Sequence, residues 1–167
     1  MAHLNASLFL SLFVTGLLAI PPLFSADKTP ADAFTSSMSV LRSPGTFTIL
    51  VYELQATKVN ALLEKNVGEK KVTLLAPTDV AFNAFGQLGA LRGTPLDEAF
   101  LKFHILQGLW PRKRLRANRT ARTLAEKPLN LKDIGKILYS IETDNGIIHV
   151  VDKVVLHPDV KKKLNLK

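Results

Sequence analysis

Hydrophobic residues in the first half of the chain recur at helical spacing. Phe34, Met38 and Leu41 fall at positions i, i+4 and i+7, which predicts a helix over residues 31–41. A second apolar series with a 3.6-residue period begins near residue 46 and ends at Asn66-Val67-Gly68, a sequence typical of a helix C-cap. The first half is therefore expected to be mainly helical.

The pattern changes at residue 72, where a short β-prone run leads into further helices. Residues 72–75 predict a strand that stops at Pro77, and Thr78 is then a good N-cap for a helix over residues 80–85. The sequence Thr94-Pro95-Leu96-Asp97 is typical of a helix start, and this helix is expected to end near Gln107-Gly108.

The last third alternates in the way that strands do. Residues 110–122 show no periodicity and are expected to form a basic loop, whereas Ile137, Tyr139 and Ile141 recur at every second position, as in a strand. The triplet Asp144-Asn145-Gly146 predicts a turn, followed by an apolar strand that runs on to Leu156. Residues 159–167 are expected to be a short basic tail.

The N-terminus is uncharged and strongly apolar. Residues 1–26 contain no Lys, Arg, Asp or Glu, and an apolar core is broken by Pro21-Pro22 before the small residues Ser25 and Ala26. This pattern predicts a secretory signal peptide over residues 1–26, with 27–33 as an N-terminal segment of the secreted, extracellular protein. An uncleaved membrane anchor is the alternative, because the n-region has little positive charge.

Composition narrows the classes of function. With 167 residues, 47% of them hydrophobic, the chain is expected to form one domain with its own core. It contains no cysteine, which excludes disulfides and thiol chemistry. The net charge of +8 favours acidic partners, and outside the cell nucleic acid is not among those we expect.

Two separated segments are familiar. The sequence from Thr73 to Phe82, with Ala-Pro-Thr-Asp at its centre, resembles the first signature block of fasciclin domains, and Asn145 to Leu156 resembles the closing block. The resemblance covers residues 34–158 and implies an α+β fold, a wedge or sandwich of β-strands with a helical layer, in a single domain. Residues 110–137 match poorly, so strands there are implied by the family alone.

The sequence shows no pattern for catalysis. It contains no nucleophile elbow, phosphate-binding loop, dinucleotide fingerprint or metal-ligand spacing, so we expect no catalytic residue, metal or cofactor. Four polar residues of the two blocks are expected to be structural, with His149 bonded toward Thr78 or Asp79; the four are Thr78, Asp79, His149 and Asp152.

One segment is a candidate for adhesion. Phe103, His104 and Ile105 lie in a stretch that looks like the Tyr-His segment of the family, which is implicated in integrin-mediated adhesion, with Phe103 where Tyr is usual. The alternative is that this apolar run belongs to the core. A second adhesion motif of animal members, an Asp-Ile pair, is not matched, because Ser140-Ile141 stands in its place.

A dense group of cations is the other candidate. Six basic residues within eleven positions are expected to attract acidic polysaccharide, unless they form only a solvated loop; they are Arg112, Lys113, Arg114, Arg116, Arg119 and Arg122. Asn118-Arg119-Thr120 is an N-glycosylation sequon within the same run, so a glycan at Asn118 would partly cover these cations.

These observations favour a binding module over an enzyme. The sequence predicts non-catalytic extracellular binding in cell adhesion or matrix organisation, with proteins or acidic polysaccharide as partners and no stable membrane anchor. The alternative function is carriage of a lipophilic small molecule such as a carotenoid, which some algal relatives are thought to perform. The identity of the partner and the oligomeric state are left open.

Overall fold

A computed structural model describes residues 36–42, 45–64 and 71–166 of the chain. Its first elements are three short helices, α1 (Ser37–Leu41), α2 (Thr48–Ala56) and α3 (Ala61–Glu64). They confirm the helical first half, although the second predicted helix divides in two where Lys58 adopts a positive φ of 61°. The proposed signal peptide, residues 27–33 and the Asn66-Val67-Gly68 stop lie outside the described residues.

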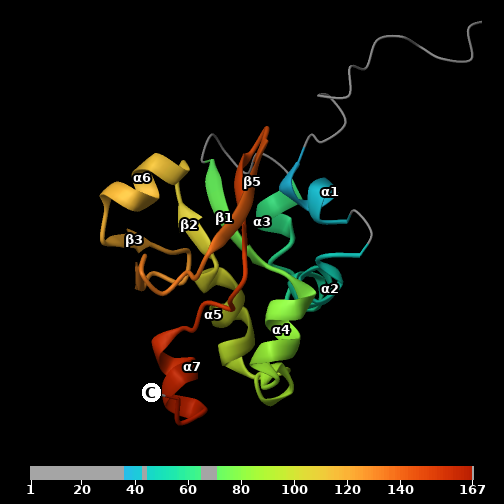
Figure 1. Ribbon diagram of the computed structural model, residues 1–167. Coiled ribbons are helices and arrows are strands. Elements are labelled where there is room, and N and C mark those ends of the chain that lie inside the picture. Colours follow the sequence, from blue (N-terminus) through green and yellow to red (C-terminus); the bar gives the residue numbers. More distant parts are fainter. Residues whose placement is uncertain (1–35, 43–44, 65–70, 167) are drawn as a thin grey trace, which may run out of the picture.

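A mixed sheet of four strands forms the centre of the fold (Figure 1). Its strands are β1 (Val72–Pro77), β2 (Ile105–Gln107), β5 (Ile137–Thr143) and β6 (Gly146–Val151), in the order β2-β1-β6-β5. β1 and β6 run parallel, and the two outer strands pair antiparallel with them. The two segments that carry the family resemblance are therefore neighbours in space.

Burial explains this order. Every residue of β6 is buried, as is almost all of β1, because helices and loops cover both faces of the central pair. The outer strand β5 has no buried residue: Ile137, Ile141 and Thr143 are half-buried and the other four residues are exposed. The long apolar run after Asp144-Asn145-Gly146 is thus a central strand, although it ends at Val151 and the chain continues without regular structure to Leu156.

The turn before β6 ties the helices to the sheet. The side-chain oxygen of Asn145 accepts hydrogen bonds from the backbone N–H and the hydroxyl of Ser37 in α1, both at 2.9 Å. Its amide group donates to the carbonyl of Leu63 in α3 at 2.8 Å. One buried side chain in a sheet turn therefore fixes two helices of the first half.

Helices α4 (Asp79–Phe85) and α5 (Pro95–Phe103) follow β1. The hydroxyl of Thr78 accepts a hydrogen bond from Ala81 N–H at 3.2 Å, which confirms Thr78 as the N-cap of α4. The second helix ends earlier than predicted, at Phe103, because Ile105–Gln107 forms strand β2 against β1. A short 3-10 turn, η2 (Leu88–Ala90), joins the two helices.

The basic stretch was wrongly expected to be a loop. Residues Arg112–Ala117 form a helix, α6, and two short strands follow it, β3 (Thr120–Arg122) and β4 (Pro128–Asn130), which pair antiparallel. Leu115, the buried residue of α6, belongs to a second core with Trp110 and Leu129, separate from the larger core under α1 to α5. Because only one of its six residues is buried, this helix has no repeating hydrophobic pattern from which the sequence could predict it.

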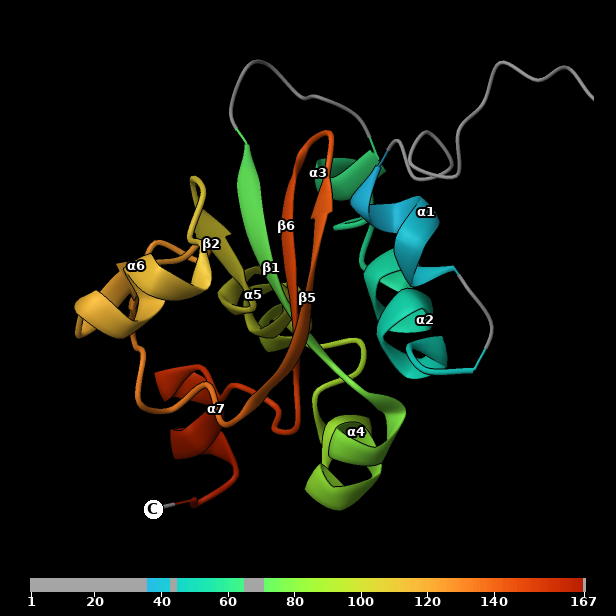
Figure 2. The same cartoon turned by 45° about the horizontal axis from the view of Figure 1, so that its top comes forward.

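The segment after Pro158 also has regular structure. Residues Pro158–Lys163 form helix α7 at the foot of the molecule, and Val160 packs into the larger core, where the sequence suggested only a basic tail (Figure 2). Among the helices of the described ranges, none has the length and apolar character needed to cross a bilayer.

Candidate functional site

A groove lies beside α6, between this helix and the loop from Leu131 to Ile137. It encloses about 640 Å³. Its floor is apolar, formed by Leu115, Leu131 and Ile134. Five cations line it, and no acidic residue is among the described residues that line it; the cations are Arg112, Arg116, Arg119, Lys132 and Lys136.

The groove therefore unites two basic segments that are separate in sequence. Three of the six cations proposed from the sequence line it, while Lys113, Arg114 and Arg122 do not. Lys132 and Lys136 were missed, because two lysines in a segment that also contains Asp133 do not stand out as a charge run. The convergence creates a denser positive potential than either segment would have alone.

Trp110 connects the start of α6 to the central sheet. Its backbone N–H donates to the hydroxyl of Thr73 in β1 at 2.9 Å, and that hydroxyl donates to the carbonyl of Gly108 at 2.9 Å. The indole N–H donates to the carbonyl of Gln107, also at 2.9 Å. Because Pro111 and α6 follow directly, the start of the basic helix is anchored to the central sheet.

The closing block, residues 145–156, also contacts Trp110. His149 Nε2 lies 2.6 Å from the carbonyl oxygen of Trp110, so this nitrogen carries the proton and donates it. His149 Nδ1 is then the acceptor for the hydroxyl of Ser140, at 2.7 Å. The structure thus corrects the expected partners of His149, since the ring bonds to neither Thr78 nor Asp79.

This network continues into the groove. Arg112 Nε donates to the same Ser140 hydroxyl oxygen at 3.0 Å, and Arg112 Nη2 donates to the carbonyl of Ile137 at 2.9 Å. A guanidinium held by two such bonds keeps its orientation, which reduces the entropy lost when an anion binds. The buried His149 therefore positions a cation that lines the groove.

The pairing of Ser140 with His149 is poorly suited to catalysis. Burial is the main cause that lowers the pKa of His149 below its usual value, and the positive charge of Arg112 lowers it further. A general base must become a cation when it takes a proton, and both effects oppose that cation. The geometry supports a structural hydrogen bond rather than an activated serine.

Asp152 fixes the opposite wall. Its carboxylate accepts a hydrogen bond from the backbone N–H of Lys136 at 2.7 Å. The neighbouring Gly135 has a φ of 74°, and a Cβ there would lie 2.5 Å from the same carboxylate. Two residues of the closing block, His149 and Asp152, thus position the two walls of one groove.

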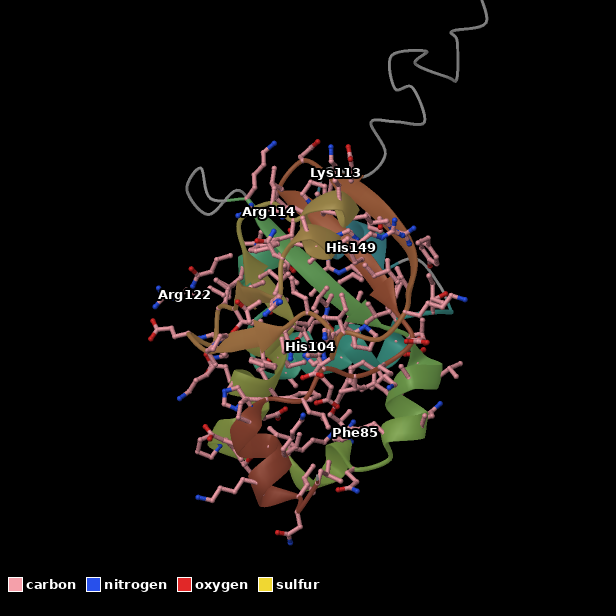
Figure 3. The ribbon with its side chains drawn as sticks, turned by 60° about the vertical axis from the view of Figure 1, so that its left-hand side comes forward. Phe85, His104, Lys113, Arg114, Arg122 and His149 are labelled. Carbon is pink, nitrogen blue, oxygen red and sulfur yellow. The ribbon has the colours of Figure 1, made fainter. Side chains whose placement is uncertain are left out.

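The remaining cations of α6 face elsewhere. The guanidinium of Arg114 stacks 4.0 Å above the ring of Trp110 and donates to the carbonyl of Leu109 at 2.6 Å. In the view of Figure 3, Lys113 and Arg114 are labelled toward the top of the molecule and Arg122 apart from them at its left edge. The six predicted cations therefore do not form a single site.

Asn118 lies in the groove wall directly after α6. Its side chain is exposed, its backbone is extended with φ −114° and ψ 158°, and its Nδ2 donates to the carbonyl of Arg114 at 2.8 Å. Thr120, the third residue of the sequon, is exposed at the start of β3. Whether a glycan is attached at Asn118 stays a prediction.

The proposed adhesion segment lies in the core. Phe103 is 2% exposed, and His104 and Ile105 are completely buried. His104 Nδ1 donates to the carbonyl of Phe100 at 2.9 Å, and its Nε2 accepts the backbone N–H of Val155 at 3.0 Å. These side chains offer no surface to a receptor, which corrects that expectation in favour of the alternative, a role in the core.

Asp79 joins two helices. Its carboxylate accepts the backbone N–H groups of Thr48 and Ile49 at 3.1 and 2.8 Å, at the start of α2. The N-cap residue of that helix, Phe47, has no side chain that could do so. Asp79 therefore caps α2 from a distant part of the chain, as a structural role requires.

The interface between helices and sheet is filled by side chains. Leu74, Ala76, Ile148 and Val150 of the central strands pack with Leu50 and other helical residues in one buried cluster. The carrier hypothesis called for an apolar pocket in this interface, where the described side chains instead pack against one another. The described residues also contain no group of three or more His, Cys, Asp or Glu side chains that could hold a metal ion.

Comparison with known proteins agrees with this architecture. The family model described as "Fasciclin domain" matches residues 45–157, which is more than half of the chain. A solved structure of a FAS1 domain pair from the insect cell adhesion molecule fasciclin I is similar, with a TM-score of 0.59 and 16% identity over 75% of this chain and 52% of that one. The chain thus spans about half the length of that structure, and the likeness shows the fold alone. A search of curated protein sequences finds no significant match. The chain belongs to the fasciclin domain family.

Proposed function

We propose that this chain is a non-catalytic module of cell adhesion or matrix organisation that binds acidic polysaccharide through the groove beside α6. The family is associated with cell adhesion and occurs in extracellular or cell-surface proteins. The observation that carries the proposal is the convergence of five cations on one groove without a carboxylate among its lining residues.

The groove suits a sugar polymer with regularly spaced anions. Guanidinium groups bind sulfate and carboxylate through paired hydrogen bonds, and three of the five cations are arginines. The apolar floor of Leu115, Leu131 and Ile134 can pack against the C–H faces of sugar rings. An open groove also accepts a chain that enters and leaves at both ends, unlike a closed pocket.

Retention on a sulfated-polysaccharide column tests the proposal. Replacing Arg116 and Arg119 by Gln lowers the net charge from +8 to +6 and removes two groove cations that are exposed. The matched control replaces Lys162 and Lys163 of α7 by Gln, which changes the net charge equally at a remote exposed surface. We expect the groove variant to elute at clearly lower salt than the control.

Salt dependence gives a second measure. Attraction between exposed charges is screened over about 8 Å at physiological ionic strength, so retention of the unchanged protein should fall steeply with salt. If both charge variants elute together, binding depends on net charge alone and the groove is not the site.

Secretion is part of the same proposal. The apolar N-terminus ends in small residues, so a mature form beginning at Ala26 or Asp27 is expected outside the cell. N-terminal sequencing of the protein from culture medium measures this. A product that begins at Met1 and fractionates with membranes would contradict secretion and leave the groove to be tested separately.

A further inference from the structure

We propose that an N-glycan at Asn118 closes the basic groove, so that occupancy of the sequon sets how much polyanion the protein binds. The inference rests on the proposed function, because it concerns regulation of the same groove. It goes beyond partial coverage of a basic loop, since the structure places the attachment residue in the wall of the site itself.

Asn118 lies where an attached glycan would obstruct the groove. It stands between Arg116 and Arg119, two of the five groove cations, and it lines the groove with them. Its side chain is exposed, as a modification enzyme requires. A glycan attached here begins at the wall of the groove, so its first sugars would compete for space with a polymer lying along the groove.

The hydrogen bond from Asn118 to Arg114 limits where the glycan can point. An unmodified asparagine amide has two N–H groups, and glycosylation replaces one of them. The other can keep the bond to the carbonyl of Arg114, which holds the attachment nitrogen 2.8 Å from the last turns of α6. The first sugar is thereby held at the groove, whereas a freely rotating side chain could carry it away from the cations.

The comparison of two forms made in the same secretory cells tests the inference. Thr120→Val removes the sequon but keeps Asn118, its bond to Arg114 and the β-branched shape at an exposed position of β3. This substitution is preferable to enzymatic release of the glycan, which converts Asn118 to aspartate and adds a negative charge to the groove. Mass spectrometry records the occupancy of each form.

A relocated glycan is the control. Gln87→Asn with Gly89→Ser, added to Thr120→Val, creates a sequon that begins at the N-cap of η2, where Gln87 is exposed and a Cβ at Gly89 meets nothing within 4 Å. Figures 1 and 2 both show α4, which ends just before η2, well away from α6. This form carries a glycan of the same kind far from the groove.

We expect Thr120→Val to bind heparin several-fold more tightly than the glycosylated parent, with the relocated form equal to Thr120→Val. Equal binding by parent and Thr120→Val, an equal loss from the relocated glycan, or secretion of the parent with Asn118 unmodified would each overturn the inference. Arg116→Gln with Arg119→Gln in the Thr120→Val background separates the two proposals. If those substitutions weaken binding but the glycan does not, the groove stands and its regulation fails; if neither matters, the proposed function fails.

Discussion

His149 on the last strand donates a hydrogen bond of 2.6 Å to the carbonyl of Trp110, which directly precedes the N-cap residue of the basic helix. The same ring accepts a hydrogen bond from the hydroxyl of Ser140, and the oxygen of that hydroxyl accepts one from Arg112. A buried imidazole with both nitrogens satisfied is stable only in one neutral tautomer. A core histidine thus determines where a surface cation lies.

We expect His149→Ala to lower the free energy of unfolding by about 1–3 kcal/mol, because the Trp110 carbonyl loses its buried partner. Urea titration measures this loss. Ser140→Ala leaves the bond to Trp110 in place and should cost less. A stability unchanged by His149→Ala, together with loss of an activity, would show that the histidine is functional rather than structural.

Asp79→Ala should destabilise the fold by about 1–2 kcal/mol, because the first N–H groups of α2 lose the carboxylate that caps them. Asp79→Asn keeps one acceptor oxygen and should lie between the parent and Asp79→Ala. Thermal melts of the three proteins give the order. Equal melting temperatures would mean that water caps the helix as well as the carboxylate does.

Stability should fall as pH drops from about 6.5 toward 4. Burial is the main cause that lowers the pKa of His104 to about 4, and protonation of Nε2 would also break the bond from Val155 N–H. The unfolded chain therefore binds more protons than the folded one in this window, so the free energy of unfolding is highest above pH 6.5 and decreases as the pH falls from there toward 4. Burial likewise lowers the pKa of His149 and His157, which adds to the same trend.

Urea titrations across this pH range measure the effect, and His104→Gln isolates it. One pKa unit corresponds to about 1.4 kcal/mol, so the lowered pKa of His104 should make the fold on the order of 3 kcal/mol less stable near pH 4 than at neutral pH. The variant should be less stable at pH 7 and should depend less on pH, so that the two curves approach each other in acid. Parallel curves would assign the acid sensitivity to other groups.

Gly146→Ala should prevent stable folding, with a loss above about 4 kcal/mol. A Cβ at this position would lie 1.9 Å from the carbonyl oxygen of Val72, at the point where β1 and β6 begin to pair. Gly89→Ala is the control, because its Cβ meets nothing within 4 Å. Circular dichroism and urea titration compare the two, and a folded Gly146→Ala protein would show that the strands can shift apart at little cost.

Local pattern predicted the elements that rely on local chemistry. β1, α4 and the turn before β6 follow from β-prone residues, an N-cap at Thr78 and Asn145-Gly146, each of which acts within a few residues. β2 could not be predicted, because Ile105–Gln107 continues an apolar helix pattern and becomes a strand only by pairing with β1. α7 was hidden in the same way, since one buried residue, Val160, holds it.

The candidate site was half visible from sequence. A charge run is a local signal, so Arg112, Arg116 and Arg119 were found, whereas Lys132 and Lys136 join them only through the fold. The partners predicted for His149 were wrong because its contacts, too, depend on the fold. The acceptor is the backbone carbonyl of Trp110. Every residue has such a carbonyl, so the residue types do not indicate which one His149 contacts.

The parallel pairing of β1 with β6 has a consequence for biosynthesis. Val72 pairs with Gly146, which the ribosome adds 74 residues later (146 minus 72), and neither strand has another parallel neighbour in the sheet. Until the last strand emerges, the apolar residues Leu74 and Leu75 remain without the partner that completes their burial. The apolar residues of β1 therefore stay uncovered in the nascent chain through most of its synthesis, and a product that stops short of Gly146 cannot assemble the central sheet.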